Sequence, residues 1–106
     1  MLMPDSDTFS IDVQERSEAT HLRLIGRFGV ATRASLDRLI RRRWPHDVVL
    51  DLEGLTFMDG AAWLVVMDLH HRVDDGGQRL QVVNVPARIR RIFEVTETEY
   101  VLSERP

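Results

Sequence analysis

The sequence predicts a mixed α/β sheet covered by helices, with its elements in the order β-β-α-β-α-β-α. Two patterns carry this prediction. Near the N-terminus, two segments alternate apolar and polar residues and flank a polar turn, as the strands of a hairpin do. Residues 47–83 then hold an apolar run, a helical pattern and a second apolar run, which is a βαβ unit. Such crossovers make their two strands parallel, so the sheet combines an antiparallel with a parallel pair.

The hairpin is predicted by two strands with a period of two residues. The apolar positions of the first strand alternate with polar residues: Phe9, Ile11 and Val13. The second alternation covers residues 21–25 and ends at Gly26, and the polar residues 15–20 form the turn between the strands. The polar residues 1–8 that precede the hairpin are expected to form a flexible N-terminus.

The first helix is predicted to begin after Thr32, whose side-chain oxygen suits an N-cap. Its apolar positions recur at helical spacing: Leu36, Leu39, Ile40 and Trp44. The basic triplet at residues 41–43 ends this helix before Pro45. Cations at a helix C-terminus are favoured by the dipole by about 0.3–1 kcal/mol each. A phosphate-binding patch is the alternative interpretation of the triplet.

The βαβ unit begins with the compact apolar run at residues 48–52, which is typical of a central strand buried on both faces. A loop over residues 53–58 leads to Asp59, a natural N-cap for the next helix. One face of that helix is largely apolar: Trp63, Val66, Met67 and His70. Gly76 and Gly77 end the helix, since glycine readily adopts the left-handed conformation common at helix ends.

The last part of the chain predicts a short strand and a helix. Residues 80–83 form the strand, and Pro86 suits the first turn of the helix. The apolar face of this helix is formed by Ile89, Ile92 and Phe93. Residues 100–102 are expected to form either a last strand or a docked extension.

Composition limits the functions that this chain can have. It has 106 residues, which fit one domain over residues 9–106, a formal net charge of −3 and no cysteine. Disulfides and thiolate metal sites are therefore excluded, and a reducing compartment, the cytoplasm, is expected. No apolar run reaches the roughly 18–20 residues of a membrane span. All 14 basic residues are arginine, but the net negative charge argues against a nucleic-acid partner.

Residues 48–62 carry the most informative pattern. An apolar strand ends in Asp51-Leu52, a short segment reaches Phe57-Met58-Asp59, and Gly60-Ala61-Ala62 opens a helix. This pattern resembles the STAS family, the domain of bacterial anti-sigma factor antagonists and of sulfate-transporter tails. The resemblance extends from about Phe9 to Ser103. It implies the STAS fold, and it implies binding of an anti-sigma factor or serine-kinase-like regulator that is switched by phosphorylation of a loop serine or threonine.

The chain departs from the family pattern at three places. The phosphoacceptor position is Ala61, which has no hydroxyl, so phosphorylation at the usual position is not expected. Gly29 stands where antagonists commonly carry an aspartate that is associated with partner binding. Glu97-Thr98 replaces the Gly-Leu pair that is usual after the last helix.

The resemblance assigns partner binding to one set of residues: Gly29, Asp59, Gly60, Ala61, Ala62 and Leu64. Asp59 is expected to be part of the docking loop, a helix cap worth about 1 kcal/mol, or both, since the two roles are compatible. Leu64 replaces a residue that is often small in the family, and it enlarges the apolar patch beside the loop. Trp63 is expected in the core.

Three functions follow as hypotheses. The first is an anti-sigma factor antagonist without the usual phosphorylation control. The second is a STAS subunit of an ABC lipid-transport complex that binds the ATPase of that complex. The third is a small-ligand sensor that uses residues 53–59. The sequence leaves both a monomer and a homodimer open as oligomeric states.

Catalysis and a cofactor are not expected. The best candidates for catalytic residues are three carboxylates that could come together at one edge of the sheet, those of Asp51, Glu53 and Asp59. His70 and His71 are adjacent, and neighbouring residues on a helix point about 100° apart, so the pair does not suit a metal ion.

Overall fold

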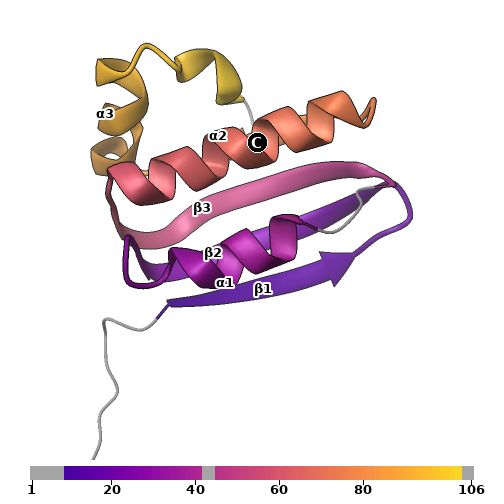
Figure 1. Cartoon of the computed structure of the whole chain (residues 1–106), viewed down its shortest axis with the longest axis horizontal. Coiled ribbons are helices and arrows are strands. Elements are labelled where there is room, and N and C mark those ends of the chain that lie inside the picture. Colours follow the sequence, from indigo (N-terminus) through magenta and orange to yellow (C-terminus); the bar gives the residue numbers. More distant parts are fainter. Residues whose placement is uncertain (1–8, 42–44, 104–106) are drawn as a thin grey trace, which may run out of the picture.

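A computed structural model describes residues 9–41 and 45–103 of the chain. Its four strands form one sheet in the order β1-β2-β3-β4 (Figure 1). The strands are β1 (Phe9–Glu15), β2 (Ala19–Phe28), β3 (Asp47–Met58) and β4 (Leu80–Val83). Strands β1 and β2 are antiparallel, whereas β2, β3 and β4 run parallel to one another. The predicted mixed sheet and the element order are confirmed.

The helices α1 and α2 lie side by side along one face of the sheet (Figure 1). The helices are α1 (Arg33–Ile40), α2 (Gly60–Asp75), α3 (Ala87–Val95) and the 3₁₀ turn η1 (Glu99–Val101). Helix α3 contacts the first part of α2 and the strand β3, at the left of Figure 1. Because each crossover returns the chain to the same end, the three α-helices all begin at the edge where β2, β3 and β4 end.

The core lies between the sheet and these helices. Its largest completely buried side chains come from every layer: Phe28, Phe93, Leu22, Leu24, Leu36, Ile40, Leu50, Leu52 and Leu69. Between the buried residues of β2, Arg23 and Ile25 are exposed, so the second face of the sheet is open to solvent. This alternation is the pattern from which the strands were predicted.

Strand β3 is longer than predicted, and the expected loop over residues 53–58 is wrong. Pairing with β2 continues to Met58, although β3 carries one extra residue opposite the step from Arg23 to Ile25 and another opposite the step from Gly26 to Arg27. These irregularities interrupt the strict alternation that identifies a strand in sequence. At Gly54 a Cβ atom would lie 3.0 Å from the carbonyl oxygen of Leu24, so glycine permits the close pairing here.

Helix α1 begins where predicted, but the capping role of Thr32 is wrong. Its hydroxyl donates to the carbonyl oxygen of Arg27 (2.7 Å) and accepts from the backbone N–H of Gly29 (3.0 Å), so it braces the loop instead. The helix ends at Ile40 with Arg41 at the C-cap. The rest of the predicted basic end, with Trp44, and the predicted flexible residues 1–8 lie outside the described part of the chain.

Two alternatives were predicted for the C-terminal segment, a last strand or a docked extension. The structure shows the docked extension. The turn η1 follows α3, and Leu102 makes an isolated parallel bridge to Val82. The predicted left-handed glycine after α2 is confirmed at Gly77, with a φ of 82°. After α3 the same role falls to Glu97, with a φ of 58°, where a side chain is unfavourable.

Replacing Glu97 with glycine is expected to raise the free energy of unfolding by about 1 kcal/mol, because the strained backbone of the exposed Glu97 is relieved. Urea unfolding followed by circular dichroism measures the change. The matched control is Glu94→Gly inside α3, which should lower stability by about 1 kcal/mol. A destabilised Glu97→Gly variant would show that the side chain of Glu97 makes a stabilising contact that outweighs the strain.

Candidate functional site

The candidate site lies where β2 and β3 end and α1 and α2 begin. The loop between β2 and α1 starts at Gly29, and Asp59 is the single residue between β3 and α2. The backbone N–H of Asp59 donates to the carbonyl oxygen of Phe28 over 3.4 Å, which keeps the two strand ends together. Ligands and partners of open α/β sheets gather at this edge.

Asp59 joins the two segments through both of its carboxylate oxygens. Oδ1 accepts from the backbone N–H of Ala62 (3.0 Å), so the predicted N-cap of α2 is confirmed. Oδ2 accepts from the backbone N–H of Val30 (3.0 Å), in the loop between β2 and α1. One side chain therefore fixes the start of α2 and the position of the neighbouring loop. This second contact was missed by the sequence analysis.

Gly29 is required by the position of this carboxylate. A Cβ atom at Gly29 would lie 2.8 Å from Oδ2 of Asp59 and 3.2 Å from Cε2 of Phe57. The first distance is shorter than a carbon–oxygen contact allows, so a side chain at position 29 would displace the carboxylate. The Asp59 carboxylate can keep this orientation because position 29 is glycine and not the aspartate that the family commonly carries. The glycine at position 29 is the sequence feature that could have predicted this contact.

The other predicted residues divide into exposed and buried ones. Leu64 is 57% exposed and Gly60 is exposed, while Ala61 is half-buried on the first turn of α2. Ala62 is completely buried and Gly29 is buried, so they act by placing the backbone. Beside them the loop exposes two apolar side chains that were not predicted. We name the exposed and half-buried apolar residues the docking surface: Val30, Ala31, Gly60, Ala61 and Leu64.

A pocket of about 320 Å³ lies at the loop side of the docking surface. Its walls are Arg27, Gly29, Val30, Ala31, Thr32, Phe57 and Asp59. The guanidinium of Arg27 lies over the ring of Phe57, 4.0 Å from its centre, and forms a cation–π contact. Both oxygens of Asp59 accept backbone hydrogen bonds, so this carboxylate is a structural group of the pocket wall.

The three carboxylates that were candidates for catalytic residues do not come together. Because β3 runs without a loop, the six residue steps from Glu53 to Asp59 span on the order of 20 Å. Oδ1 of Asp51 accepts from the backbone N–H of Glu53 (2.9 Å) within the strand. The predicted small-ligand loop over residues 53–59 is likewise extended strand up to Met58.

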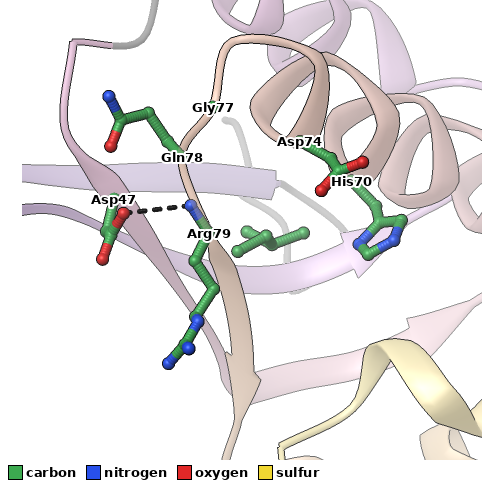
Figure 2. Close-up of a pocket in the computed structure, with 7 residues that line it drawn as sticks. Asp47, His70, Asp74, Gly77, Gln78 and Arg79 are labelled. Atoms are coloured by element: carbon green, nitrogen blue, oxygen red, sulfur yellow. Dashed lines mark hydrogen bonds between the residues drawn. The ribbon is translucent and has the colours of Figure 1, made fainter.

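A second pocket, of about 540 Å³, lies at the opposite end of the sheet (Figure 2). Oδ1 of Asp47 accepts from the backbone N–H of Arg79 (3.0 Å), and His70 and Asp74 face the pocket from α2. Nδ1 of His70 is buried and has no hydrogen-bond partner. Within residues 9–41 and 45–103, no three side chains of metal-ligating type lie close enough to hold one ion.

Comparison with known proteins decides the family. A family model described as "Mlab, STAS domain" matches residues 11–102. The chain belongs to the STAS family. This confirms the resemblance that was carried by residues 48–62. No curated protein matches the chain.

Solved structures of STAS proteins share this fold at low sequence identity. An anti-sigma factor antagonist from Mycobacterium paratuberculosis is 16% identical, with a TM-score of 0.81, over 98% of this chain and 91% of that one. The antagonist SpoIIAA in its unphosphorylated form is 17% identical, with a TM-score of 0.72, over 89% and 86%. The Bacillus cell fate determinant SpoIIAA in the phosphorylated form is 17% identical, with a TM-score of 0.67, over 89% of both chains.

In the described part of this STAS domain, no helix is long and apolar enough to cross a membrane.

Proposed function

We propose that this STAS domain is a non-catalytic interaction module of the cytoplasm that binds an anti-sigma factor or serine-kinase-like regulator. The observation that carries the proposal is the double contact of Asp59, which holds the loop at Val30 against the start of α2. The docking surface is built on the two segments that this contact joins. The solved structures that resemble the chain are anti-sigma factor antagonists, which supports a partner of this kind.

The exposure of the docking surface supports a protein partner. Val30 is 67% exposed and Leu64 is 57% exposed, although both are large apolar side chains. Exposed apolar residues that gather on one surface are typical of protein interaction sites. Ala61 lies on the first turn of α2, three residues before Leu64, and carries no hydroxyl, so a phosphate at that position does not control the binding.

Replacing Ala61 with aspartate is expected to weaken partner binding by about tenfold or more, because a charge in an apolar interface must be desolvated. The dissociation constant is measured against each anti-sigma or kinase-type regulator of the same genome. The fold should persist, since a carboxylate in the first turn of a helix is favourable. The matched control is His71→Asp on the exposed face of α2. Equal affinities of both variants and the parent chain would place the interface elsewhere.

A second function is favoured by the family that the chain matches, which is described as "Mlab, STAS domain" and not as an anti-sigma factor antagonist. The chain would then be the STAS subunit of an ABC lipid-transport complex and would bind the ATPase of that complex. The same binding experiment separates the two functions when the transporter ATPases of the genome are included. Binding to an ATPase and to no sigma regulator would support this second function.

A further inference from the structure

The two edges of the sheet differ in how they are covered. At one edge, the C-terminal segment lies beside β4: Leu102 pairs with Val82, and the backbone N–H of Ser103 donates to the carbonyl oxygen of Val82 over 2.8 Å. At the other edge lies β1, and no described element lies beyond it (Figure 1). Strand β1 is therefore the open edge of the sheet in the described part of the chain.

The outer side of β1 carries backbone groups that β2 does not bind. The backbone N–H of Arg16 donates to the carbonyl oxygen of Ala19 over 2.9 Å, so the backbone groups of Arg16 point toward β2. Along an antiparallel strand, these groups point alternately toward and away from the neighbouring strand. The N–H and C=O groups of Val13, Ile11 and Phe9 therefore point outward, and no described residue beyond the hairpin bonds to them.

Strand β1 lacks several features that protect the edge strands of other proteins from a second chain. Edge strands are commonly very short, bulged, or interrupted by proline or lysine. All 7 residues of β1 pair with β2 without a register shift, and none of them is proline or lysine. Apolar surface is also uncovered here, since Val13 is 38% exposed and both Phe9 and Ile11 are only half-buried against the core. A strand added at this edge would bury this apolar surface and bind the outward backbone groups.

A second copy of β1 fits this edge when a twofold axis passes through Ile11. The two strands are then antiparallel, Ile11 faces its own copy, and Phe9 faces Val13 of the second copy. Because the backbone groups of all three residues point outward, each of these opposite pairs exchanges both of its N–H···O bonds. The apolar side chains of the three pairs lie on the covered face, where they extend the core across the interface.

The exposed polar residues of β1 select this axis among its neighbours. An axis at Ile11 places Asp12 opposite Ser10 of the second copy, and a serine hydroxyl is a suitable donor to that carboxylate. An axis at Asp12 would bring two Asp12 carboxylates together, and an axis at Val13 would place Glu15 opposite the apolar Ile11. Axes nearer to either end pair only a short piece of the described strand. Charge and apolar complementarity therefore favour the axis at Ile11.

We propose that two copies of this chain form a dimer in which their β1 strands pair antiparallel around a twofold axis at Ile11. The two sheets then form one continuous sheet with the β1 strands at its centre. Because antiparallel pairing reverses the direction of the second copy, the two docking surfaces lie at opposite ends of this sheet. Each dimer therefore offers its docking surfaces to two separate partners. The dimer itself does not depend on the proposed function.

Sedimentation velocity of the full chain, from micromolar to submillimolar concentrations, tests the dimer. We expect an equilibrium between the monomer and a species of twice its mass. Ser10→Asp places two carboxylates opposite each other at both ends of the interface, so it should raise the dissociation constant by about tenfold or more. Adding Asp12→Ser to this variant restores one carboxylate opposite one hydroxyl and should restore the dimer.

Gln14→Asp is the matched control, because it adds the same charge on the same exposed face but outside the paired residues. Circular dichroism checks that each variant keeps the fold, as expected for exposed positions. A chain that is monomeric at every concentration would overturn the proposal. A Ser10→Asp variant that dimerises as strongly as Gln14→Asp would overturn it as well.

Disulfide cross-linking measures the register directly. The chain has no cysteine, so single cysteines report on chosen positions. The axis at Ile11 places Ser10 opposite Asp12 of the second copy with Cα atoms about 4.5 Å apart, a separation that a disulfide spans. Under mild oxidation, a mixture of the Ser10→Cys and Asp12→Cys variants should therefore form a covalent dimer, and each variant alone should form much less. No covalent dimer in the mixture, or an equal yield from Asp12→Cys alone, would overturn the proposed pairing.

Discussion

Replacing Gly29 with aspartate is expected to lower the free energy of unfolding by about 3 kcal/mol, the largest effect we predict for a single residue. The new Cβ atom would lie 2.8 Å from Oδ2 of Asp59, so one of the two groups must move. Overpacking costs about 1–3 kcal/mol, and loss of a hydrogen bond to a charged group costs about 1.5–3 kcal/mol. If Asp59 yields, the N–H of Val30 loses its acceptor. The melting temperature should fall by about 12–24 °C.

A double-mutant cycle shows whether Asp59 is the group that position 29 must avoid. Gly29→Ala alone should lower stability by about 2 kcal/mol, and it should cost at least about 1 kcal/mol less in the Asp59→Ala background. In that background the two nearest contacts, to Oδ2 and Cγ of Asp59, are gone, and the contact to Cε2 of Phe57 at 3.2 Å remains. Gly60→Ala is the matched control, because nothing lies within 4 Å of a Cβ atom there. Additive effects would show that the loop moves away without involving Asp59.

The elements that the sequence predicted correctly are those whose burial follows a simple period. The alternation in β1 and β2 reflects a sheet with one covered face, and the apolar run of β4 is buried except at Gln81. Helix α2 shows both its cap and its terminal glycines. Family membership was also predictable, because Asp51-Leu52 and Phe57-Met58-Asp59 stand at fixed spacing in one short segment. Each of these signals is local in sequence.

The errors arise where contacts between distant segments decide the structure. Residues 53–58 look like a loop because two extra residues in β3 break its alternation, and the strand that pairs with them is distant in sequence: Ile25, the partner of Gly54, lies 29 residues earlier. Thr32 was expected to cap α1, but Arg27 and Gly29 compete for its hydroxyl. The contact between Asp59 and Val30 likewise joins two segments that no local pattern brings together.

Trp63 is the second residue whose replacement should have a large effect. Its ring is half-buried against the core, and its Nε1–H donates to Oγ1 of Thr98 over 3.1 Å. Trp63→Ala should lower the free energy of unfolding by about 2–3 kcal/mol, less than the 3–5 kcal/mol of a completely buried aromatic residue. The neighbouring Leu64→Ala, at an exposed position, should change it by less than about 0.5 kcal/mol. Urea unfolding followed by circular dichroism gives both values.

The hydrogen bond and the packing of Trp63 can be separated. Trp63→Phe keeps most of the apolar ring but removes the donor, so it should cost about 1 kcal/mol. Thr98 keeps its bond to Oγ1 of Thr96 (2.8 Å) in that variant and is not left unsatisfied. If Trp63→Phe costs as much as Trp63→Ala, the contact to Thr98 and not the packing of the ring connects α2 with the segment after α3.

Variants at Gly29 and Trp63 separate effects on stability from effects on partner binding. Trp63 connects α2 with the C-terminal segment on the side of α3, whereas Asp59 holds the docking surface through the loop at Val30. Trp63→Ala should therefore reduce stability while the dissociation constant of the folded protein changes little. Gly29→Asp should reduce both, because the displaced Asp59 carboxylate no longer fixes Val30. Equal losses of affinity in the two variants at a temperature where both are folded would show that the interface extends to α3.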